Sequence, residues 1–325
     1  MSSIHALWTF NQTAKGIIPQ MLSASDYWQP DNVSSWYNKS ATTARAKAQL
    51  FNTKRSQADE VYCKESLKLT ITANARIDNR SDLLKALSLK SEDVSTDSQL
   101  ILAAYVYWGR ECPRYLRGDF VFIIWDEEQH KIFCARDHFG VKVLFYSQQK
   151  RGVMLSNEHN AFFTSSWADN TQIDEAVLVH NLWGLGSKQF QSPCSDIKIL
   201  PPAHVLEIDA QGATLYKFWQ LESKSDWQKL TDKELIAELK LRFKKAVEVR
   251  CDTNYPLGAE LSEGLDSNGV AGYAARFMPD DKIYTFSYKC AALTEENHHI
   301  WADTYKDIED MLALYTNLQP VWRSS

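Results

Sequence analysis

The sequence has no surplus of basic residues. Its 36 lysine and arginine residues are outnumbered by 41 aspartate and glutamate residues, which gives a formal net charge of −5. A protein that binds nucleic acid neutralises phosphates with a basic surface, so this composition argues against a nucleic-acid partner. A small-molecule substrate fits the charge better.

The sequence also lacks paired cysteines and long apolar runs. Its six cysteines form no C-x-x-C pair, which argues against a zinc site and against a disulfide framework. We expect free thiols in a reducing compartment at these positions: Cys63, Cys112, Cys134, Cys194, Cys251 and Cys290. No apolar run approaches the ~20 residues that span a bilayer, and the first residues carry no basic leader. These absences favour a cytoplasmic protein with no membrane partner.

The first two-thirds of the chain are rich in predicted strands. At 325 residues the chain is long enough for two domains. The apolar spacing predicts helices over 81–87 and 97–108. β-Branched and aromatic runs separated by turn residues predict antiparallel strands at 67–73, 120–125, 131–135, 143–146, 153–156 and 205–208. We therefore expect a mixed α/β first domain over residues 1–215.

The last third alternates predicted strands and helices. The capping box T-D-K-E, which begins at Thr231, opens a long amphipathic helix. A strand at 255–261, a helix at 266–277, a strand at 282–287 and a helix at 295–315 are predicted to follow. This βαβ order predicts the beginning of a parallel sheet over residues 216–325. Such sheets usually need about five strands, and the chain stops where the third should begin, so we expect an incomplete domain.

One loop carries most of the functional information. Residues 256–267 read P-L-G-A-E-L-S-E-G-L-D-S, a strand followed by a short turn that opens a helix. Gly264 lets backbone amides approach phosphate oxygens, and the hydroxyls of Ser262 and Ser267 can donate to them. Leu265 lies in the same turn, and the helix that starts near Asp266 adds its positive end. Asp266 is the carboxylate suited to Mg²⁺. The loop predicts a pyrophosphate site, although an ordinary capped turn reads similarly.

The loop closely resembles the P-x-G-x-x-L-S-G-G-x-D-S loop of the asparagine synthetase family. Motifs earlier in the chain resemble that family in the same order. They are N-A-R-I-D-N at 74–79, T-D-S-Q-L-I-L at 96–102, L-R-G-D-F-V-F at 116–122, A-R-D-H-F-G-V-K-V-L-F-Y at 135–146 and L-P-P-A-H at 200–204.

The resemblance implies a fold and a chemistry. The first domain would be a class II glutamine amidotransferase, an αββα sandwich of the N-terminal-nucleophile type, and the second a truncated α/β adenine-nucleotide-hydrolase-like domain with a PP-loop. Such a protein uses ATP and Mg²⁺ to adenylate a small-molecule or peptide carboxylate and transfers the acyl group to an amine donor. Ser287 lies on the strand beside the loop, where this fold usually receives adenine. The resemblance also places Asn74 at an oxyanion position and Asp97 at the substrate's amino group.

The glutaminase half departs from the family pattern. The chemistry needs a cysteine immediately after the initiator Met, but this chain has Ser2. Gly is replaced by Ala75 and Glu by Arg76 beside the retained Asn74. Ser2 could still act as a weak nucleophile, but we expect the glutaminase to be inactive. β-Lactam synthetases and lasso-peptide cyclases, which lost the same cysteine, use an amine already present in the substrate.

The ligase half departs as well. Glu263 replaces the second glycine of the loop, and nothing after Gly264 resembles the family's G-G-E-G-x-D-E loop. A carboxylate about 4 Å from a phosphate would cost about 4 kcal/mol at an effective dielectric near 20. Either Glu263 points away, or Mg²⁺ and lysine neutralise it, or the loop binds ATP poorly.

Besides an amide-forming ligase, two other functions stay open. The first is a non-catalytic truncated paralogue or fragment that keeps the amidotransferase-like domain for binding or assembly. A tRNA-thiolating ATP pyrophosphatase is a weaker reading, because the first domain argues against it. The sequence leaves the oligomeric state open, a homodimer included.

Overall fold

The protein is described here from a computed structural model. The structure describes residues 2–10, 12–165, 167–168, 171–184, 191–223, 225–289 and 298–324. The chain divides into two compact units, residues 1–221 and 222–325. Each unit has its own sheets and its own hydrophobic core, so each is described by itself.

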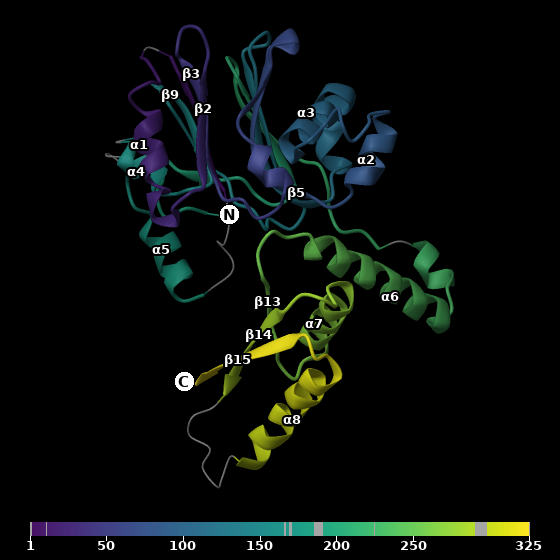
Figure 1. Cartoon of the computed structure of the whole chain (residues 1–325). Helices are drawn as coiled ribbons and strands as arrows, with labels where there is room; N and C mark the ends of the chain where they lie inside the picture. The colour runs from purple at the N-terminus through teal and green to yellow at the C-terminus, as the bar shows by residue number, and fades with distance from the viewer. Residues whose placement is uncertain are drawn as a thin grey trace. The chain divides into compact units, whose positions relative to one another are not determined.

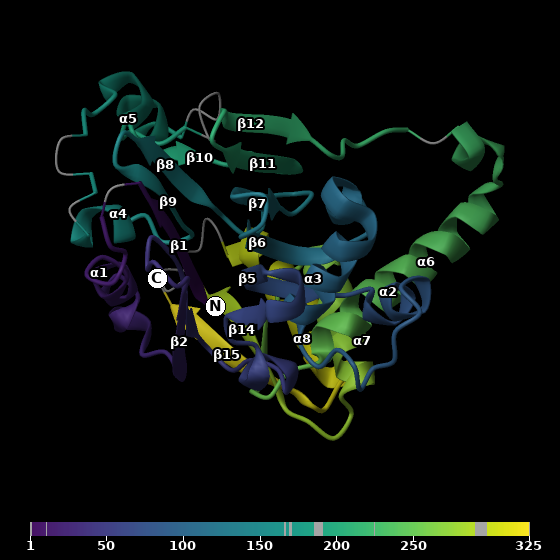
Figure 2. The ribbon, with the colours of Figure 1, turned by 90° about the horizontal axis from the view of Figure 1, so that it is seen from above.

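The first unit contains two six-stranded antiparallel sheets. One sheet has the order β10-β8-β9-β1-β3-β2 and the other β12-β11-β7-β6-β5-β4; Figure 2 shows β12, β11, β7, β6 and β5 following one another. The strands of the first sheet are β1 (Ser3–Thr9), β2 (Asn32–Tyr37), β3 (Thr43–Gln49), β8 (Phe145–Gln149), β9 (Gly152–Ser156) and β10 (Lys198–Ile199). Those of the second are β4 (Tyr62–Lys64), β5 (Leu69–Ile77), β6 (Gly118–Asp126), β7 (Lys131–Arg136), β11 (His204–Asp209) and β12 (Gly212–Lys217).

Helices cover the outer faces of both sheets. Figure 1 shows α1 and α4 outside one sheet and α2 and α3 outside the other. The helices of this unit are α1 (Ile18–Ser23), α2 (Arg80–Ala86), α3 (Asp97–Trp108), α4 (Ala161–Thr164) and α5 (Glu175–Leu182). Short 3₁₀ turns lie at Asp26–Trp28, Arg55–Ala58, Glu65–Leu67 and Gly109–Arg114.

Three apolar clusters hold these four layers together. The first packs Leu7 and Ala46 against α1, the second joins the sheets through residues such as Ile4 and Trp125, and the third packs Ile71 against α3. This αββα sandwich confirms the predicted fold class. It arises because side chains alternate between the two faces of a strand, so strands such as β6, which lie between two layers, are apolar on both faces.

The second unit contains a three-stranded parallel sheet of order β13-β14-β15. Its strands are β13 (Leu257–Glu260), β14 (Ile283–Lys289) and β15 (Leu318–Ser324), and its helices are α6 (Asp232–Glu248), α7 (Leu265–Phe277) and α8 (His298–Leu314), with 3₁₀ turns at Ser225–Lys229 and Val249–Cys251. Val247, Ala274, Ile283 and Leu318 share one apolar cluster. The predicted capping box is present, because the Thr231 side chain accepts from the Glu234 amide and the Glu234 side chain accepts from the Thr231 amide.

The third strand corrects one expectation. The sequence predicts only a stub at 320–325, but β15 pairs in parallel with β14 from Leu318, opposite Ile283, to Ser324, opposite Lys289. Pro320 obscured this strand, because proline cannot donate to a sheet ladder. As an edge strand, β15 tolerates it.

Two other expectations can be compared with the structure. Cys63, Cys112, Cys134, Cys194 and Cys251 are thiols rather than disulfides, as predicted. Cys290 and the first part of the helix predicted at 295–315 lie outside the described residues. Among those that are described, no helix is long and apolar enough to cross a membrane.

Candidate functional site

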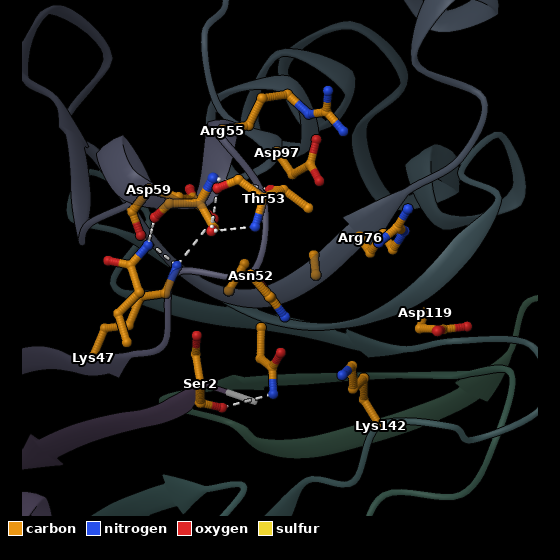
Figure 3. A pocket seen from close by; sticks show the side chains of 15 residues that line it. Ser2, Lys47, Asn52, Thr53, Arg55, Asp59, Arg76, Asp97, Asp119 and Lys142 are labelled. Carbon is orange, nitrogen blue, oxygen red and sulfur yellow. Dashed lines mark hydrogen bonds and ion pairs between the residues drawn. The ribbon is translucent and has the colours of Figure 1, made fainter. Parts of the chain in front are cut away.

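A polar cavity of about 200 Å³ lies in the first unit. It brings together three residues that the sequence marks as candidates, namely Ser2, Asn74 and Asp97. They come from the start of the chain, from β5 and from the first turn of α3, and strand β3 with the segment 52–59 after it supplies much of the remaining wall (Figure 3). The sandwich therefore assembles the cavity from segments that are far apart in the sequence.

Ser2 is held in this cavity through its backbone carbonyl. The carbonyl oxygen accepts a hydrogen bond from Asn74 Nδ2 at 2.7 Å and another from Asn157 Nδ2 at 3.0 Å. The Ser2 hydroxyl oxygen accepts a long bond from the Leu50 amide at 3.4 Å. Asn74 therefore uses an amide N–H to fix the chain's own backbone, and its role as an oxyanion donor stays a prediction.

Asp97 is buried and bonded through both carboxylate oxygens. Oδ2 accepts from the Ile77 amide at 3.1 Å, and Oδ1 pairs with Arg80 Nη1 at 3.1 Å. Burial raises the pKa of Asp97, and the bond from Ile77 opposes that rise. The side chain stabilises the entry into α3 and lies at the cavity wall, so a ligand would have to share oxygens that are already in use.

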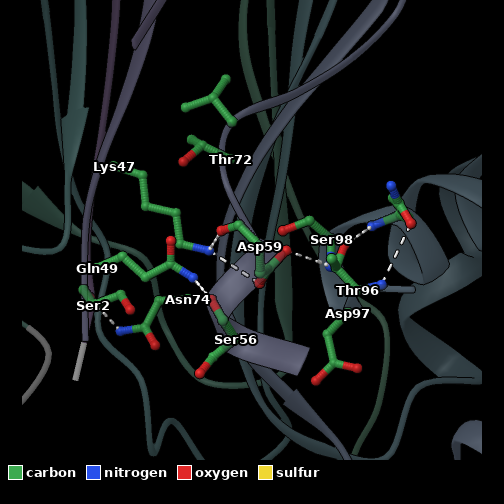
Figure 4. Close-up of polar contacts among 12 residues, drawn as sticks. Ser2, Lys47, Gln49, Ser56, Asp59, Thr72, Asn74, Thr96, Asp97 and Ser98 are labelled. Carbon is green, nitrogen blue, oxygen red and sulfur yellow. Dashed lines mark hydrogen bonds and ion pairs between the residues drawn. The ribbon is translucent and has the colours of Figure 1, made fainter. Parts of the chain in front are cut away.

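The sequence did not reveal a buried ion pair beside these residues. Lys47 Nζ lies 3.0 Å from Asp59 Oδ2, and both side chains are buried. Asp59 Oδ1 also accepts from the Ser98 amide at 3.2 Å, so the pair joins β3 to the first turn of α3 (Figure 4). A signal existed, because T-A-R-A-K-A-Q at 43–49 alternates polar residues with alanine, as a strand with one polar face does.

The rest of the cavity wall is strongly charged. Figure 3 draws Arg76, Asp119 and Lys142 on one side of the cavity and Lys47 with Asp59 on the other. Arg76 Nε also lies 3.7 Å from Asp78 Oδ1 outside the cavity. Only Arg76 among these charges was singled out from the sequence, as a departure from the family pattern.

The predicted pyrophosphate loop follows β13 in the second unit and is bonded to itself. The Ser262 amide donates to Ser267 Oγ at 3.1 Å, the Gly264 amide donates to Ser262 Oγ at 3.2 Å, and the two hydroxyl oxygens lie 2.9 Å apart. Asn268 Nδ2 donates to the carbonyls of Ser262 and Gly264 at 2.9 and 3.0 Å. Two amides of the loop thus donate to its own hydroxyl oxygens. Phosphate oxygens could take the place of these hydroxyls as acceptors.

The acidic residues of this loop are exposed. Glu263, Leu265 and Asp266 all face solvent, and Asp266 lies in the first turn of α7. Ser287 differs, because its buried hydroxyl donates to the Leu261 carbonyl at 2.7 Å and so anchors the start of the loop. In the part of the chain that the structure describes, no group of three histidine, cysteine or acidic side chains gathers to hold a metal ion by itself.

Comparisons with known proteins agree with this division. Residues 1–219 match the model of the glutamine amidotransferase domain family, and residues 238–309 match that of asparagine synthase. Asparagine synthetase [glutamine-hydrolyzing] 3 of Bacillus subtilis is 28% identical over 229 residues, which cover 67% of this chain and 36% of the relative. A putative asparagine synthetase [glutamine-hydrolyzing] 2 of Methanocaldococcus jannaschii is 27% identical over 272 residues, 76% of this chain and 51% of the relative.

A solved structure supports the fold. The glutamine phosphoribosylpyrophosphate amidotransferase of B. subtilis, complexed with ADP and GMP, aligns with a TM-score of 0.50 at 11% identity, over 85% of this chain and 64% of that one. The curated relatives are much longer, since the chain spans about a third to a half of their length. The amidotransferase model covers more than half of the chain, which therefore belongs to the glutamine amidotransferase domain family, and the shorter second match and the curated relatives make it similar to the asparagine synthetases.

Proposed function

We propose that the chain is an ATP- and Mg²⁺-dependent amide-forming ligase of the asparagine synthetase type with an inactive glutaminase half. A substrate carboxylate oxygen would bond to the α-phosphorus of ATP as pyrophosphate leaves. An amine would then bond to the acyl carbon as AMP leaves and a proton is released. The curated relatives named as asparagine synthetases support this chemistry.

The observation that carries the proposal is the loop between β13 and α7. Two of its amides and the hydroxyls of Ser262 and Ser267 converge at the N-terminal end of a helix. Helix α7 has no side-chain cap at Gly264, so phosphate oxygens can serve as the acceptors for its first N–H groups. Asn268 and Ser287 hold the loop's carbonyls and orient its amides.

The donor set fits Mg²⁺ bound together with a nucleotide. Mg²⁺ in such sites usually takes one or two carboxylates, with phosphate oxygens and water as its other ligands. Asp266 is exposed on the first turn of α7 and can supply one carboxylate. The ion would neutralise phosphate charge, while the loop's own amides and hydroxyls would hold the pyrophosphate in place.

The glutaminase proposal depends on Ser2 and its surroundings. A hydroxyl is a much weaker nucleophile than a thiolate, and Asn74 Nδ2 already donates to the Ser2 carbonyl. The amine would therefore come from a donor other than hydrolysed glutamine. Incubation of the protein with glutamine should release no ammonia, and ammonia release that Ser2→Ala abolishes would contradict this part.

ATP–pyrophosphate exchange tests the ligase directly. The full chain would be incubated with ATP, Mg²⁺, labelled pyrophosphate and a panel of carboxylic and amino acids, because exchange requires only the adenylating half-reaction. We expect label in ATP that depends on one of the acids and falls about 100-fold with Asp266→Asn. If no acid supports exchange, the chain is not an adenylating ligase by itself.

A second function has one observation in its favour. The loop carries Glu263 and satisfies its amides with its own hydroxyls, so it is stable without a nucleotide. A non-catalytic paralogue that keeps the amidotransferase-like unit for binding or assembly would look the same. Absence of both nucleotide binding and exchange would favour that function.

A further inference from the structure

The second sheet of the first unit ends in an open edge at strand β12. This strand is the outermost of its sheet, and in the described part of the chain it pairs with β11 alone (Figure 2). Its sequence, G-A-T-L-Y-K, contains no proline, and most of its residues are exposed. An exposed edge strand of this length can pair with another extended chain.

The hydrogen-bond pattern shows which backbone groups of β12 point outward. Directly after the strand, the Phe218 amide donates to the Ala203 carbonyl at 2.9 Å. Along an antiparallel pair, residues that bond to the partner strand alternate with residues that point away from it. Ala213, Leu215 and Lys217 therefore direct their N–H and C=O groups away from β11. These three residues offer a row of donors and acceptors to an added strand.

The other sheet edges of the first unit are less suited to such pairing. Strands β4 and β10 have only three and two residues. Strand β2 has six residues, but the segment before β4 is bonded to it. Asn32 Nδ2 donates to Glu60 Oε1 at 2.8 Å, and the Val61 amide donates to Ser34 Oγ at 3.0 Å. The edge of β12 is therefore the one we expect to accept another chain.

The side chains beside this edge are cationic. The guanidinium carbon of Arg110 lies 4.1 Å from the centroid of the Tyr216 ring, and the Tyr216 hydroxyl donates to the Arg110 carbonyl at 3.1 Å. Arg110 is exposed, and so is Lys217 at the end of the strand. The strand has no acidic residue of its own. An extended chain on β12 would therefore meet positive charge.

The acidic side chains near Arg110 are already paired with other cations. The charges of Glu111 and Glu207 act on Arg110. Glu111 Oε2 lies 2.5 Å from Arg114 Nε, and Glu207 Oε2 lies 3.3 Å from Lys131 Nζ. A second copy of β12 would add like charges to this edge, which destabilises a strand pair. An acidic chain would instead complement it.

We propose that β12 binds an extended acidic segment of a partner protein as an additional strand of the sheet. Main-chain hydrogen bonds supply affinity in this mode of recognition, and alternate side chains supply specificity. Because successive side chains point to opposite faces of a sheet, residues of the segment on the face of Tyr216 would meet Arg110, which prefers a carboxylate. Residues on the other face would meet Leu215, which is 44% exposed.

The preferred segment therefore alternates acidic and β-branched apolar residues. Fluorescence anisotropy of the full chain with the labelled heptapeptide E-V-E-V-E-V-E tests the proposal, and we expect saturable binding. The peptide E-V-E-P-E-V-E lacks one backbone N–H and should bind about tenfold more weakly. The peptide K-V-K-V-K-V-K reverses the charge and should bind more weakly still.

Two variants of the protein locate the site. Leu215→Pro removes one outward N–H of β12, and Arg110→Glu reverses the charge beside it; each should weaken the acidic peptide about tenfold. Val33→Pro makes the same backbone change on the edge strand β2, and Lys85→Glu makes the same charge reversal class on the exposed surface of α2. Both controls should bind the peptide as the wild type does. Circular dichroism confirms that each variant is folded.

Several outcomes would overturn the proposal. No binding of E-V-E-V-E-V-E at millimolar concentration would remove the site, and equal binding of the proline peptide would exclude strand addition even if Leu215→Pro fails to fold. Equal losses in the variants and their controls would place the peptide elsewhere. Displacement of the peptide by oligothymidylate would show a general anion site, and a dimer that Leu215→Pro abolishes would show self-pairing. ATP–pyrophosphate exchange, which depends on the second unit, is independent of all these results.

Discussion

The two units hold their polar residues in opposite ways. In the first unit, Lys47, Asp59 and Asp97 are buried and each is bonded to another part of the fold. In the second unit, the charged residues of the loop face solvent, and its hydroxyls and amides bond to one another. A buried charge without its partner is costly, whereas an exposed charge is solvated. Substitutions should therefore reduce stability in the first unit and ligand binding or activity in the second.

The largest expected effect is on the buried pair of the first unit. Lys47→Met leaves Asp59 buried without its counter-charge, and such a change costs about 3–5 kcal/mol. Amide hydrogen exchange of β3 would measure the loss within this unit. The control is Lys229→Met, because its ion pair with Asp226 is exposed and the change should cost less than about 0.5 kcal/mol. Similar losses of unfolding free energy in both variants would show that the buried and the exposed ion pair do not differ in their contribution to stability.

The next effect concerns the exposed carboxylate of the loop. Asp266→Asn removes the charge proposed to hold Mg²⁺, and we expect ATP–pyrophosphate exchange to fall about 100-fold, or about 2.7 kcal/mol, with an unchanged melting temperature. Asp280→Asn removes the same charge from an exposed turn in the same unit and serves as the control. A drop in melting temperature equal to that of Lys47→Met would show that the loop residue is structural.

The third prediction concerns the pH dependence of stability that the buried His5 ring gives the first unit. The ring is fully buried, with Nδ1 3.0 Å from Ser156 Oγ and Nε2 3.2 Å from Ser3 Oγ, and burial lowers the pKa of His5 from 6.5 to about 3. Below pH 6.5, His5 therefore binds a proton in the unfolded chain but stays neutral in the folded chain. The free energy of unfolding should fall by about 1.4 kcal/mol per pH unit below pH 6.5, or by about 2 kcal/mol at pH 5.

The matched variant for this test is His5→Gln, which cannot titrate. Urea unfolding of the wild type and the variant at pH 7.5, 6.5 and 5 separates His5 from the other histidines, because their contributions cancel in the difference. The wild type should lose about 2 kcal/mol more than the variant between pH 6.5 and pH 5. Parallel pH profiles would contradict the buried, neutral ring.

The fourth prediction concerns the two hydrogen bonds by which Asn268 holds the loop in its conformation. Asn268→Ala removes two hydrogen bonds to the loop's carbonyls, each worth about 0.5–1.5 kcal/mol, and we expect exchange to fall about tenfold. Asn317→Ala is the control, because that amide donates to three carbonyls, of Ala275, Met278 and Asp281, away from the loop. Exchange per folded molecule should be unchanged in Asn317→Ala, and equal losses in both variants would mean that Asn268 has no special role in the loop.

The sequence predicted the second unit's loop better than the first unit's cavity, for a physical reason. The loop is local: S-E-G-L-D-S lies between a strand and a helix, and the structure places it after β13 and at the start of α7. The cavity instead joins the start of the chain to β3, β5 and α3, which only the packing of two sheets brings together. The resemblance grouped Ser2, Asn74 and Asp97, but no local pattern links Lys47 to Asp59.

Ser287 shows the same limit within the second unit. Its position beside the loop could be predicted from the strand order. Its bond to the Leu261 carbonyl depends on the register, in which Glu260 lies opposite Phe286, and a one-residue shift would turn Ser287 to the other face of the sheet. Pro320 similarly prevented the prediction of β15. A strand can contain a proline when it lies at the edge of a sheet, and the sequence does not show that position.

The smallest expected effect sharpens the account of the loop. Glu263 replaces a family glycine, and a carboxylate fixed about 4 Å from a phosphate would cost about 4 kcal/mol. The exposed side chain can instead remain in water, where salt screens it. Glu263→Gly should therefore raise ATP affinity by less than tenfold in fluorescence titrations at 0.15 M salt, and by more at low salt. A gain of several hundredfold would show that Glu263 faces the phosphates and that the loop of this chain holds ATP poorly.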